Sequence, residues 1–388
     1  MRGALVVLGL LLVLTGGIWL GGHPEALPEV VRDALVEEGP AVRADVIQTI
    51  EEHFYRPVSK AKLEEASLSG MVASLNDPYS RYFSPTQAKS FNEDISGKFE
   101  GVGMSVHPST KKEGLVITDT FPGAPARRAG MRAGDVIIAV NGRSIAGEGI
   151  NNATDRIKGK PGTFVNLTVR RGGETIKFHV KRAKITVPEV KGRLVTRDGK
   201  KWAVVSLASF SSGVHARLRQ EIDKQLKAGA DGILLDLRGN PGGLLREGVL
   251  VSSIFIDRGT IVSTRGRAEP KRVYKAEGDA IAAHIPVVAL VDQGTASASE
   301  ITTGALLDRG RATVVGTRTF GKGVFQEIEP LENGGALDLT VGHYYLPNGE
   351  PLPKNGIRPQ VKASDNPKTP NKDEALPIAL DVLARSLK

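Results

Sequence analysis

Ser297 lies at a junction that could support nucleophilic chemistry. The apolar run at residues 285–290 predicts a buried strand, and the small and apolar residues at 297–306 predict a helix. A serine at such a strand-to-helix turn has backbone N–H groups and the positive end of the helix dipole around it. These groups can hold a nucleophile and stabilise the oxyanion that forms when a hydroxyl attacks a carbonyl carbon. The turn therefore indicates Ser297 as a candidate nucleophile.

A serine hydroxyl needs a base, and the second half of the chain contains few histidines. From residue 185 onward there are three, His215, His284 and His343, and none lies in a motif-like setting. A Ser-His-Asp arrangement with His215 or His284 stays open as an alternative. In that arrangement Asp236, at the end of a predicted strand, would orient the histidine.

Lys322 is the candidate base. Gly321 and Gly323 flank it and let the backbone come close to other groups. A lysine of ordinary pKa, about 10.4, is protonated near neutral pH. Lowering that pKa by about 3 costs roughly 4 kcal/mol, which removal from water can supply. We therefore expect a site that is closed to water, with Phe320 and Phe325 as apolar neighbours of Lys322.

Two polar residues that follow Ser297 could also take part in chemistry. Ser299 is a rival nucleophile, but it falls inside the first turn of the predicted helix, where its hydroxyl can bond locally. Glu300 could act as an acid, although a glutamate in a first helical turn complements the helix dipole. We therefore expect Ser297 to be the nucleophile and Glu300 to stabilise the helix.

The composition bounds the class of protein. The chain has 388 residues, enough for two or three domains, and its 40% hydrophobic content supports packed cores. It has no cysteine, which excludes disulfides, thiol catalysis and cysteine zinc sites. The sequence also lacks the motifs of zinc peptidases, phosphate-binding loops and EF-hands. We therefore expect neither a metal nor a nucleotide cofactor.

The N-terminal segment predicts export. A short basic region at residues 1–3 precedes the uncharged run 4–20, which is mostly leucine and valine. This run is intermediate in length between a signal-peptide core and a full membrane span. Residues 21–24 (Gly-Gly-His-Pro) make a poor cleavage site. We therefore expect residues 1–22 to be an uncleaved membrane anchor, with a cleaved signal sequence as the alternative.

Residues 41–95 predict a small helical region. Apolar residues recur at helical spacing over 42–54 and again over 63–75, and Pro57 separates the two predicted helices. Pro85 then marks the first position of a third helix. Helices this amphipathic either pack on another part of the chain or pair between the subunits of a homodimer.

Residues 96–184 change to short β-like runs separated by glycine-rich turns. Residues 122–142, P-G-A-P-A-R-R-A-G-M-R-A-G-D-V-I-I-A-V-N-G, resemble the corresponding segment of PDZ domains. The resemblance implies a peptide-binding domain with a strand edge that can pair with the peptide. It also implies a loop for the peptide's C-terminal carboxylate, formed by Gly101, Val102, Gly103 and Met104.

The net charge of +9 is concentrated in this segment. Residues 96–184 contain 16 lysines and arginines against 7 aspartates and glutamates, so the rest of the chain is neutral. Nucleic-acid binding would call for aromatic residues interleaved with these charges, and the segment has only four phenylalanines. We therefore expect no nucleic-acid partner, but attraction to carboxylate-bearing ligands or an anionic membrane.

Residues 185–362 predict an α/β fold with a mixed sheet and flanking helices. Apolar strand-like runs at 202–207, 232–237 and 286–291 alternate with helix-like segments, and after residue 323 the sequence is again typical of β-strands. Residues 363–388 are expected to form a C-terminal tail.

Three motifs together resemble the carboxyl-terminal processing proteases, which are Ser/Lys endopeptidases of the bacterial envelope and of chloroplasts. They are G-T-A-S-A-S-E-I around Ser297, F-G-K-G-V-F-Q around Lys322, and L-R-G-N-P-G-G at residues 237–243. The resemblance runs over residues 41–361 in the family's order of helical segment, PDZ domain and protease core.

The motif positions carry the family's site residues onto this chain. The resemblance implies Ser297 as nucleophile, Lys322 as general base and Gln326 as the residue that orients the lysine. It also implies an oxyanion hole made by the N–H groups of Gly243 and Ala298. Four extended residues span about 13 Å, so the chain must bend after the lysine if Gln326 is to reach it.

The expected function is that of a serine endopeptidase in the cell envelope, periplasmic or otherwise extracytoplasmic, that processes or degrades proteins near their C-termini. Its partners would be proteins or peptides with free C-termini, the membrane through residues 1–22, and a second subunit or an activating protein. The PDZ domain would bind the substrate's C-terminus or gate the cleft. The alternatives are a PDZ adaptor with an inactive protease-like core and a Ser-His-Asp hydrolase.

Overall fold

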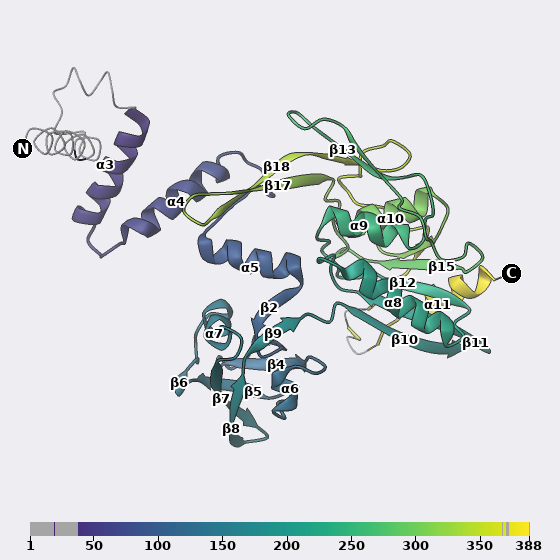
Figure 1. The fold of residues 1–388 in the computed structure, drawn as a ribbon, viewed down its shortest axis with the longest axis horizontal. Coiled ribbons are helices and arrows are strands. Elements are labelled where there is room, and N and C mark those ends of the chain that lie inside the picture. Colours follow the sequence, from purple (N-terminus) through teal and green to yellow (C-terminus); the bar gives the residue numbers. More distant parts are fainter. Residues whose placement is uncertain (1–18, 20–37, 367, 370–371, 388) are drawn as a thin grey trace, which may run out of the picture. The chain divides into compact units, whose positions relative to one another are not determined.

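The computed structural model describes residue 19 and residues 38–366, 368–369 and 372–387 (Figure 1). The chain divides into two compact units, residues 1–84 and 85–388. The predicted anchor or signal sequence at residues 1–22 lies outside the described residues, apart from Trp19. Within the described part of the chain, no helix is both long enough and apolar enough to cross a membrane.

The first unit has two helices and a short strand: α3 (Glu38–His53), α4 (Lys60–Ala73) and β1 (Arg81–Phe83). Both helices follow the predicted apolar spacing, yet most of the apolar side chains are exposed, with Val46 50% and Met71 54% exposed. Ile47 of α3 is buried, whereas α4 buries no residue. The large exposed apolar residues around these helices are Val42, Val46, Phe54, Tyr55, Met71 and Leu75.

The segment that resembles a PDZ domain is inserted between two paired strands. After helix α5 (Pro85–Ser96), strand β2 (Lys98–Gly101) leads into the segment and β9 (Ala183–Thr186) leads out, and the two strands pair antiparallel. Between them lies a sheet in the order β3-β4-β5-β7-β8, with β6 beside β5. Strand β3 is therefore an edge strand, with one side open for pairing. The bounds are β3 (Met104–Pro108), β4 (Leu115–Thr120), α6 (Pro125–Arg128), β5 (Val136–Val140), β6 (Arg143–Ser144), α7 (Ile150–Ile157), β7 (Phe164–Arg171) and β8 (Glu174–Lys181).

The insertion has its own hydrophobic core, built from alternating residues of its strands. On β7, Val165, Leu167 and Val169 are buried, whereas Phe164 before them and Asn166 between the first two are exposed. This period of two is expected for a sheet with one covered face, and it confirms the β character predicted for the segment.

A buried ion pair anchors the turn before β5. Asp135 is 1% exposed and accepts hydrogen bonds from Arg171 Nε at 2.6 Å and Nη2 at 2.7 Å. The N–H of Arg132 donates to the same carboxylate at 2.9 Å. Burial alone would raise the pKa of Asp135, but these hydrogen bonds outweigh burial and lower the pKa. Arg171 therefore contributes to the basic excess of the insertion while it serves a structural purpose.

The α/β core is built on a six-stranded mixed sheet with helices on both faces (Figure 1). The strand order is β10-β11-β12-β15-β16-β19. The first pair is antiparallel and the other neighbours are parallel, which confirms the α/β prediction. The strands are β10 (Val190–Arg197), β11 (Lys200–Leu207), β12 (Gly232–Asp236), β15 (Val287–Val291), β16 (Thr313–Gly316) and β19 (Val361–Lys362).

Successive residues of β11 pack on opposite faces of this sheet. Ala203 and Val205 belong to the hydrophobic cluster that contains three helices. Trp202 and Val204 belong to a second cluster, with one helix from the C-terminal part of the chain. The helices of the first cluster are α8 (Val214–Lys227), α9 (Leu245–Ser253) and α10 (Ala298–Asp308), and the helix of the second is α11 (Ala375–Arg385).

Helix α11 corrects the expectation of a tail at residues 363–388. Its Leu380 and Leu383 are buried in the cluster that covers the sheet. The sequence A-L-P-I-A-L-D-V-L-A-R places apolar residues three and four positions apart, so one face of a helix is apolar. Residues 375–385 are therefore part of the core.

A second, antiparallel sheet carries the residues that follow Lys322. In it β17 pairs with β18, β18 with β13, and β13 with β14. In the first sheet, the loops after β12 and β15 leave the C-terminal ends of adjacent parallel strands, which is where open α/β sheets place functional loops. The strands of the second sheet are β13 (Thr260–Gly266), β14 (Arg272–Lys275), β17 (Val324–Pro330) and β18 (Ala336–Tyr345).

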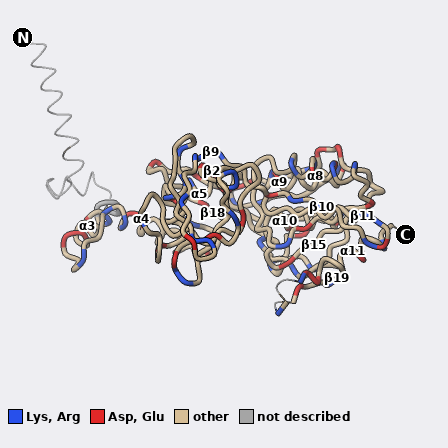
Figure 2. Tube along the Cα trace, turned by 90° about the horizontal axis from the view of Figure 1, so that it is seen from below, with Lys and Arg blue, Asp and Glu red and all other residues tan. Residues whose placement is uncertain are grey.

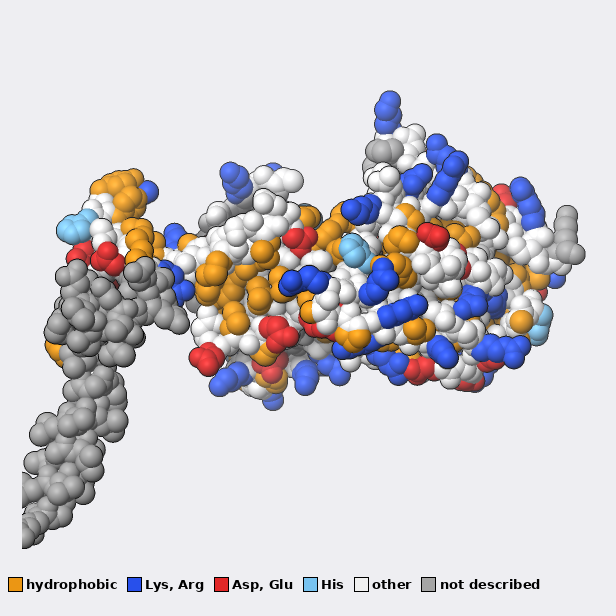
Figure 3. All heavy atoms as spheres, turned by 90° about the horizontal axis from the view of Figure 1, so that it is seen from above, with side chains coloured by type: hydrophobic (Ala, Val, Ile, Leu, Met, Phe, Trp, Pro, Cys, Tyr) orange, Lys and Arg blue, Asp and Glu red, His pale blue; other side chains and the backbone are white. Residues whose placement is uncertain are grey.

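Charged residues of both signs are interspersed along the chain (Figure 2). On the face shown in Figure 3, lysine and arginine side chains are scattered among uncharged groups and do not form one continuous band. A nucleic-acid-binding face usually presents a basic stripe or patch. The face in Figure 3 shows no such continuous stripe, and the expectation of no nucleic-acid partner stays a prediction.

Candidate active site

Ser297 lies between strand β15 and helix α10, at the predicted strand-to-helix turn. Its backbone has φ 56° and ψ −118°, a conformation that residues other than glycine rarely adopt. Such a conformation costs about 1–3 kcal/mol and persists only where surrounding contacts fix it. The residue is buried. A strained serine at a strand-to-helix turn is the arrangement of a nucleophile elbow.

Glu300 connects the Ser297 turn to the Lys322 turn. It is 0% exposed, and its carboxylate accepts four hydrogen bonds. One oxygen accepts from the N–H of Ser297 at 3.0 Å and the N–H of Lys322 at 2.9 Å. The other accepts from Thr319 Oγ1 at 2.6 Å and the N–H of Gly321 at 2.7 Å. The sequence predicts for Glu300 only a role at the helix dipole, because the path of the loop that brings these donors back is not visible in the sequence.

Lys322 lies at the apex of a tight turn. The N–H of Gly323 donates to the carbonyl oxygen of Gly321 at 3.1 Å, which closes a three-residue turn. Gly321 has φ 96°, and a Cβ there would lie 2.1 Å from the carbonyl oxygen of Lys354. A Cβ on Gly323 would lie 2.6 Å from the carbonyl oxygen of Leu352. The two glycines therefore admit a neighbouring stretch of backbone.

The expected apolar shell around Lys322 is present only in part. Phe320 is 53% exposed, so the expectation that it helps to exclude water is wrong. It precedes the turn in an irregular loop, where no strand alternation directs its side chain inward. Phe325 is buried and packs against Tyr344, with ring centroids 5.6 Å apart. Lys322 itself is half-buried.

Tyr344 lies beside the Lys322 turn, although no sequence motif includes it. The side chain of Ser297 lies near enough to its hydroxyl to lower the pKa of Tyr344, against the larger effect of burial. Its backbone N–H donates to the carbonyl oxygen of Gly323 at 2.9 Å, so strand β18 lies directly beside the Lys322 turn. Burial raises the pKa of Tyr344 well above its ordinary value, so the phenol stays protonated. A tyrosine in a late strand gives no sequence signal that separates it from a core residue.

Gly242 and Gly243 bring the third motif against the Ser297 turn. A Cβ on Gly242 would lie 2.6 Å from the carbonyl oxygen of Ala296 and 2.9 Å from the nitrogen of Ala298. Among the residues that the structure describes, the N–H groups of Gly243 and Ala298 find no hydrogen-bond acceptor. Two such N–H groups near a nucleophile could bind an oxyanion. Their assignment as the oxyanion hole stays a prediction.

Ser299, the rival nucleophile, is occupied by a local bond. Its Oγ donates to the carbonyl oxygen of Asn240 at 3.0 Å, and the residue is fully buried. The same carbonyl accepts the N–H of Ala296 at 3.0 Å. The side chain of Asn240 donates in turn to the carbonyl oxygen of Leu207 at 2.8 Å. This network holds the loop after β12 against the Ser297 turn, and it favours Ser297 over Ser299 as the nucleophile.

Asp236, which could have oriented a histidine, is paired with an arginine. Arg238 donates to it through Nη2 at 2.8 Å and Nε at 3.0 Å. The same guanidinium donates to Asp365 at 3.0 Å and to Asp373 at 2.9 Å. This cluster ties the loop after β12 to the C-terminal segment, which accounts for the carboxylate of Asp236 without a catalytic role.

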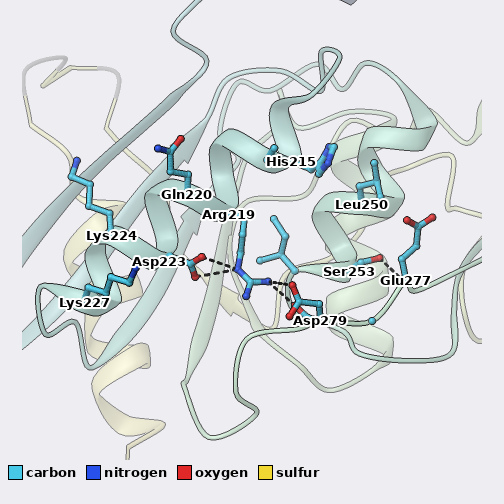
Figure 4. Close-up of a pocket in the computed structure, with 13 residues that line it drawn as sticks. His215, Arg219, Gln220, Asp223, Lys224, Lys227, Leu250, Ser253, Glu277 and Asp279 are labelled. Carbon is cyan, nitrogen blue, oxygen red and sulfur yellow. Dashed lines mark hydrogen bonds and ion pairs between the residues drawn. The ribbon is translucent and has the colours of Figure 1, made fainter.

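The three histidines of the core do not surround Ser297. His215 Nδ1 lies 2.8 Å from Glu247 Oε2, and His215 lines an open cavity of about 840 Å³ beside helix α8 (Figure 4). Ser297 is not among the residues that line this cavity. His284 and His343 are exposed. The geometry therefore gives no support to a Ser-His-Asp triad at Ser297.

Gln326 lies on β17, near the Lys322 turn. Its side-chain Nε2 donates to Thr340 Oγ1 of β18 at 3.1 Å. The register of the two strands shifts between Phe325 and Gln326, which marks an irregularity in the ladder. The bend that the sequence requires is provided by the turn that closes at Gly323. The orienting role of Gln326 toward Lys322 stays a prediction.

The predicted carboxylate loop of the insertion connects β2 to β3. Gly101 ends β2 and Met104 begins β3. Gly103 has φ 78°, and a Cβ there would lie 2.4 Å from the Cβ of Ala124, so this position requires glycine. The N–H groups of Val102 and Gly103 have no acceptor within the described residues. They could therefore receive an anion, and the peptide-binding role of the loop stays a prediction.

Three family models match consecutive parts of the chain. The model of peptidase family S41 matches residues 201–363, a PDZ domain model matches residues 116–171, and the model of the activating protease CtpB N-terminal domain matches residues 41–86. These three matches fall in the α/β core, in the insertion before it and in the helical region that precedes the insertion, respectively.

The chain is 39% identical over 319 residues to the carboxy-terminal processing protease CtpA of Bacillus subtilis (strain 168), an alignment that covers 81% of this chain and 67% of that protein. It is 38% identical over 326 residues to a protein of Staphylococcus aureus (strain bovine RF122 / ET3-1) named "Probable CtpA-like serine protease", covering 84% of this chain and 64% of that protein. The chain thus spans about two thirds of the length of these curated relatives. The solved structure of a photosystem II D1 C-terminal processing protease superposes with a TM-score of 0.51 at 28% identity, over 85% of this chain and 94% of that one.

Proposed function

The chain belongs to peptidase family S41 and is related to the carboxy-terminal processing proteases, and we propose that it is a serine endopeptidase that cleaves proteins near their C-termini. Ser297 is its nucleophile and Lys322 its general base in this proposal. The observation that carries the assignment is the buried carboxylate of Glu300, which accepts the backbone N–H groups of both residues. One shared acceptor fixes the nucleophile's turn against the lysine's turn, and positioning of this kind is a large part of catalysis.

In the proposed reaction, Lys322 Nζ takes the proton of Ser297 Oγ as this oxygen attacks the scissile carbonyl carbon. The N–H groups of Gly243 and Ala298 donate to the carbonyl oxygen as it becomes negative. Lys322 then gives its proton to the leaving amine, and the acyl group remains on Ser297. A water molecule, deprotonated by Lys322, attacks this ester and frees the serine. Gln326 orients Lys322 during these steps.

The insertion would supply the preference for C-termini. The N–H groups of Val102 and Gly103 are available for a carboxylate, and the edge strand β3 begins directly after them. A peptide that paired with β3 would therefore bring its terminal carboxylate to these groups. The basic excess of residues 96–184 attracts an anionic peptide end over a longer range.

The segment that follows the insertion could transmit a movement of the insertion to the active site. Glu189, which follows β9, is buried and accepts hydrogen bonds from Ser211 Oγ and from Arg217 Nη2, the latter at 2.7 Å. Phe210, next to Ser211, donates its N–H to the carbonyl oxygen of Gly242 at 2.8 Å. A displacement of the insertion that moved Glu189 would thus reach the glycine pair beside Ser297. Substrate or partner binding to the insertion would act on the oxyanion loop along this path.

The proposed location is the cell envelope, outside the cytoplasm. The uncharged run of residues 4–20 after a basic start supports export, with residues 1–22 as a membrane anchor or a signal sequence. The exposed apolar side chains of α3 and α4, including Val46 and Met71, support pairing with a second subunit or with an activating protein.

The test is cleavage of an unstructured protein by the purified chain and by Ser297→Ala and Lys322→Ala. Both variants should be inactive, and mass spectrometry of envelope proteins in cells with Ser297→Ala should reveal proteins with longer C-termini. Cleavage by Ser297→Ala would contradict the assignment of Ser297 as the nucleophile. If Lys322→Ala kept activity and Ser297→Ala did not, a histidine would again be a candidate for the general base. A wild-type chain that neither cleaves nor reacts with a serine-directed probe would instead indicate a PDZ adaptor.

A further inference from the structure

Three exposed basic residues lie on the two backbone segments that carry and hold the Lys322 turn. Arg318 precedes the turn, and Lys354 and Arg358 belong to the segment that packs against it. Among the residues that the structure describes, none of these three forms an ion pair or a side-chain hydrogen bond. The three residues, which we call the basic rim, therefore have their charges available for another molecule.

The contacts of the first segment fix the side from which Arg318 extends. Thr319 is buried, whereas Arg318 and Phe320 on either side of it are exposed. Thr319 Oγ1 donates to the buried carboxylate of Glu300 at 2.6 Å, so the buried side of the segment faces Glu300. The N–H of Phe320 donates to the carbonyl oxygen of Thr295, in the turn that carries the nucleophile, at 3.0 Å. The exposed side chains therefore extend from a backbone that is fixed against the site.

The second segment runs antiparallel to the first. The carbonyl oxygen of Ile357 accepts the N–H of Thr319 at 3.2 Å, and the N–H of Ile357 donates to Thr319 Oγ1 at 2.7 Å. Further along, a Cβ on Gly321 would lie 2.1 Å from the carbonyl oxygen of Lys354. Since position 319 lies beside 357 and position 321 beside 354, the two chain directions are opposite.

This pairing places Arg318 and Arg358 at neighbouring positions of two segments whose backbones are about 5 Å apart. Like charges opposite each other on paired segments are destabilising. No acidic residue of the described chain forms an ion pair with either arginine. A bound carboxylate would relieve this repulsion, so the basic rim has the electrostatics of a carboxylate-binding surface.

We propose that the basic rim is a subsite for carboxylates of the polypeptide substrate, so that the enzyme cuts preferentially beside acidic residues or close to a free C-terminus. The inference rests on the proposed function and names the substrate class of the same site. Arg318 and Arg358 can each offer two N–H groups to a carboxylate, and Lys354 adds a third positive charge. The exposed ring of Phe320 offers an apolar contact to the carbon chain that carries the carboxylate.

The basic rim lies within reach of a substrate that is bound at Ser297. The N–H groups of Ser297 and Lys322 share one oxygen of Glu300, at 3.0 Å and 2.9 Å. The four-residue step from Arg318 to Lys322 spans at most about 13 Å, and an extended substrate advances about 3.3 Å per residue. A carboxylate about three or four residues from the scissile bond can therefore meet the basic rim while the bond lies at the serine.

Arg193 and Lys227 provide a matched control. Both are exposed, and neither forms an ion pair within the described part of the chain. Arg193 lies on β10, at one edge of the six-stranded sheet, whereas the basic rim connects to β16 and β19 at the other edge. The double variant Arg193→Gln/Lys227→Gln thus removes as much positive charge as Arg318→Gln/Arg358→Gln, but away from the site.

The experiment compares the full-length wild type and the two double variants on three peptides that share one cleavage sequence. One peptide has acidic residues beside the scissile bond and an amidated end, one is neutral with a free C-terminus close to the bond, and one is neutral and amidated. We expect the wild type to prefer one or both of the carboxylate-bearing peptides. In Arg318→Gln/Arg358→Gln the KM for the preferred peptide should rise about 3- to 30-fold, as for loss of two exposed ion pairs. Its kcat on the neutral amidated peptide should stay within about twofold of the wild type, as should all constants of the control variant.

The two carboxylate-bearing peptides distinguish the source of the carboxylate, since a preference for the first assigns side chains and a preference for the second assigns the chain end. A rise in ionic strength from about 0.01 M to about 1 M should abolish the preference, because the Debye length falls from about 30 Å to about 3 Å. A merely structural role of the arginines would give no such dependence on salt.

Equal KM values for the three peptides in the wild type, or the same preference in Arg318→Gln/Arg358→Gln, would overturn the proposal. The rate of labelling of Ser297 by a fluorophosphonate probe should be the same in this variant and in the wild type. Slower labelling would also contradict the proposal, because the arginines would then act on the nucleophile and not on the substrate. If the wild type itself is not labelled at Ser297, the proposed function fails, and this outcome is distinct from the failure of the basic rim alone.

Discussion

Replacement of Glu300 by glutamine tests whether one buried carboxylate holds the nucleophile's turn and the base's turn together. Each carboxylate oxygen of Glu300 accepts two hydrogen bonds, one pair from the N–H groups of Ser297 and Lys322 and the other from Gly321 N–H and Thr319 Oγ1. Glutamine has the same shape, but only one of its two terminal atoms accepts. Glu300→Gln therefore keeps the packing and removes the acceptor from one of the two pairs.

The free-energy cost of Glu300→Gln depends on which pair of donors loses its acceptor. If the amide nitrogen faces Thr319, the threonine hydroxyl can rotate to accept from it, and only the N–H of Gly321 is left unsatisfied. If it faces Ser297 and Lys322, two N–H groups are left unsatisfied. One buried N–H without a partner costs about 1–3 kcal/mol, and the remaining bonds also lose the negative charge of their acceptor. A total of about 2–4 kcal/mol lowers the equilibrium constant for docking of the lysine turn by about 30- to 1,000-fold.

The assay is cleavage of an unstructured protein at saturating substrate, together with thermal unfolding. We expect kcat of Glu300→Gln to fall by up to about 30- to 1,000-fold, because the competent arrangement is less populated. Glu247→Gln is the matched control, since Glu247 is also buried and accepts the N–H groups of Gly213 at 2.7 Å and His215 at 3.0 Å. It should lose stability and keep kcat. A Glu300→Gln enzyme with a lowered unfolding temperature and wild-type kcat would refute the reasoning.

Three further predictions concern the Ser297 turn and the insertion. Ser297→Gly should have a free energy of unfolding about 1 kcal/mol higher than that of Ser297→Ala, measured in denaturant, because glycine adopts φ 56° and ψ −118° without strain. Equal free energies of unfolding would contradict the strain. Ser299→Ala should cost about 1 kcal/mol of stability through loss of its bond to Asn240 and should keep its proteolytic rate; loss of activity in a folded variant would make Ser299 the nucleophile again. The pKa of Asp135 is lowered in the folded state, so its contribution to stability is complete above about pH 3.9 and is lost as the pH falls through the lower, folded value. The wild type should therefore be more stable than Asp135→Asn in urea at pH 6, and the gap should narrow below about pH 4; a gap independent of pH would exclude this linkage.

The motif positions predicted several parts of the fold and the site. The strand before Ser297, the helix after it and the glycines around Lys322 were predicted from local residue types, because apolar runs and turn glycines leave a direct signal. The loop that ends in Gly242 and Gly243 was also located, and the structure brings it against the Ser297 turn. These features depend on residues that are close to one another in the sequence.

The features that were missed depend on contacts between distant residues. Glu300 was assigned to the helix dipole because its partners lie in a loop that returns from beyond the helix. Tyr344 was missed because strand β18 comes to lie beside the Lys322 turn only in the folded chain, which the sequence does not reveal. Phe320 was expected to be buried because it is aromatic and adjacent to a glycine, but the irregular loop leaves it exposed. The helix α11 was taken for a tail because the preceding polar and proline-rich stretch obscured its apolar face.

The most direct test of the central claim is the rate of fluorophosphonate labelling at Ser297 in the wild type and in Lys322→Ala, read by peptide mass spectrometry. A nucleophile that is activated by Lys322 should give one adduct, on the peptide that contains Ser297. The rate should fall about 100-fold or more in Lys322→Ala, since a positioned general base contributes about 10²–10⁴-fold. An adduct on a different residue, or the same labelling rate in both proteins, would contradict the account.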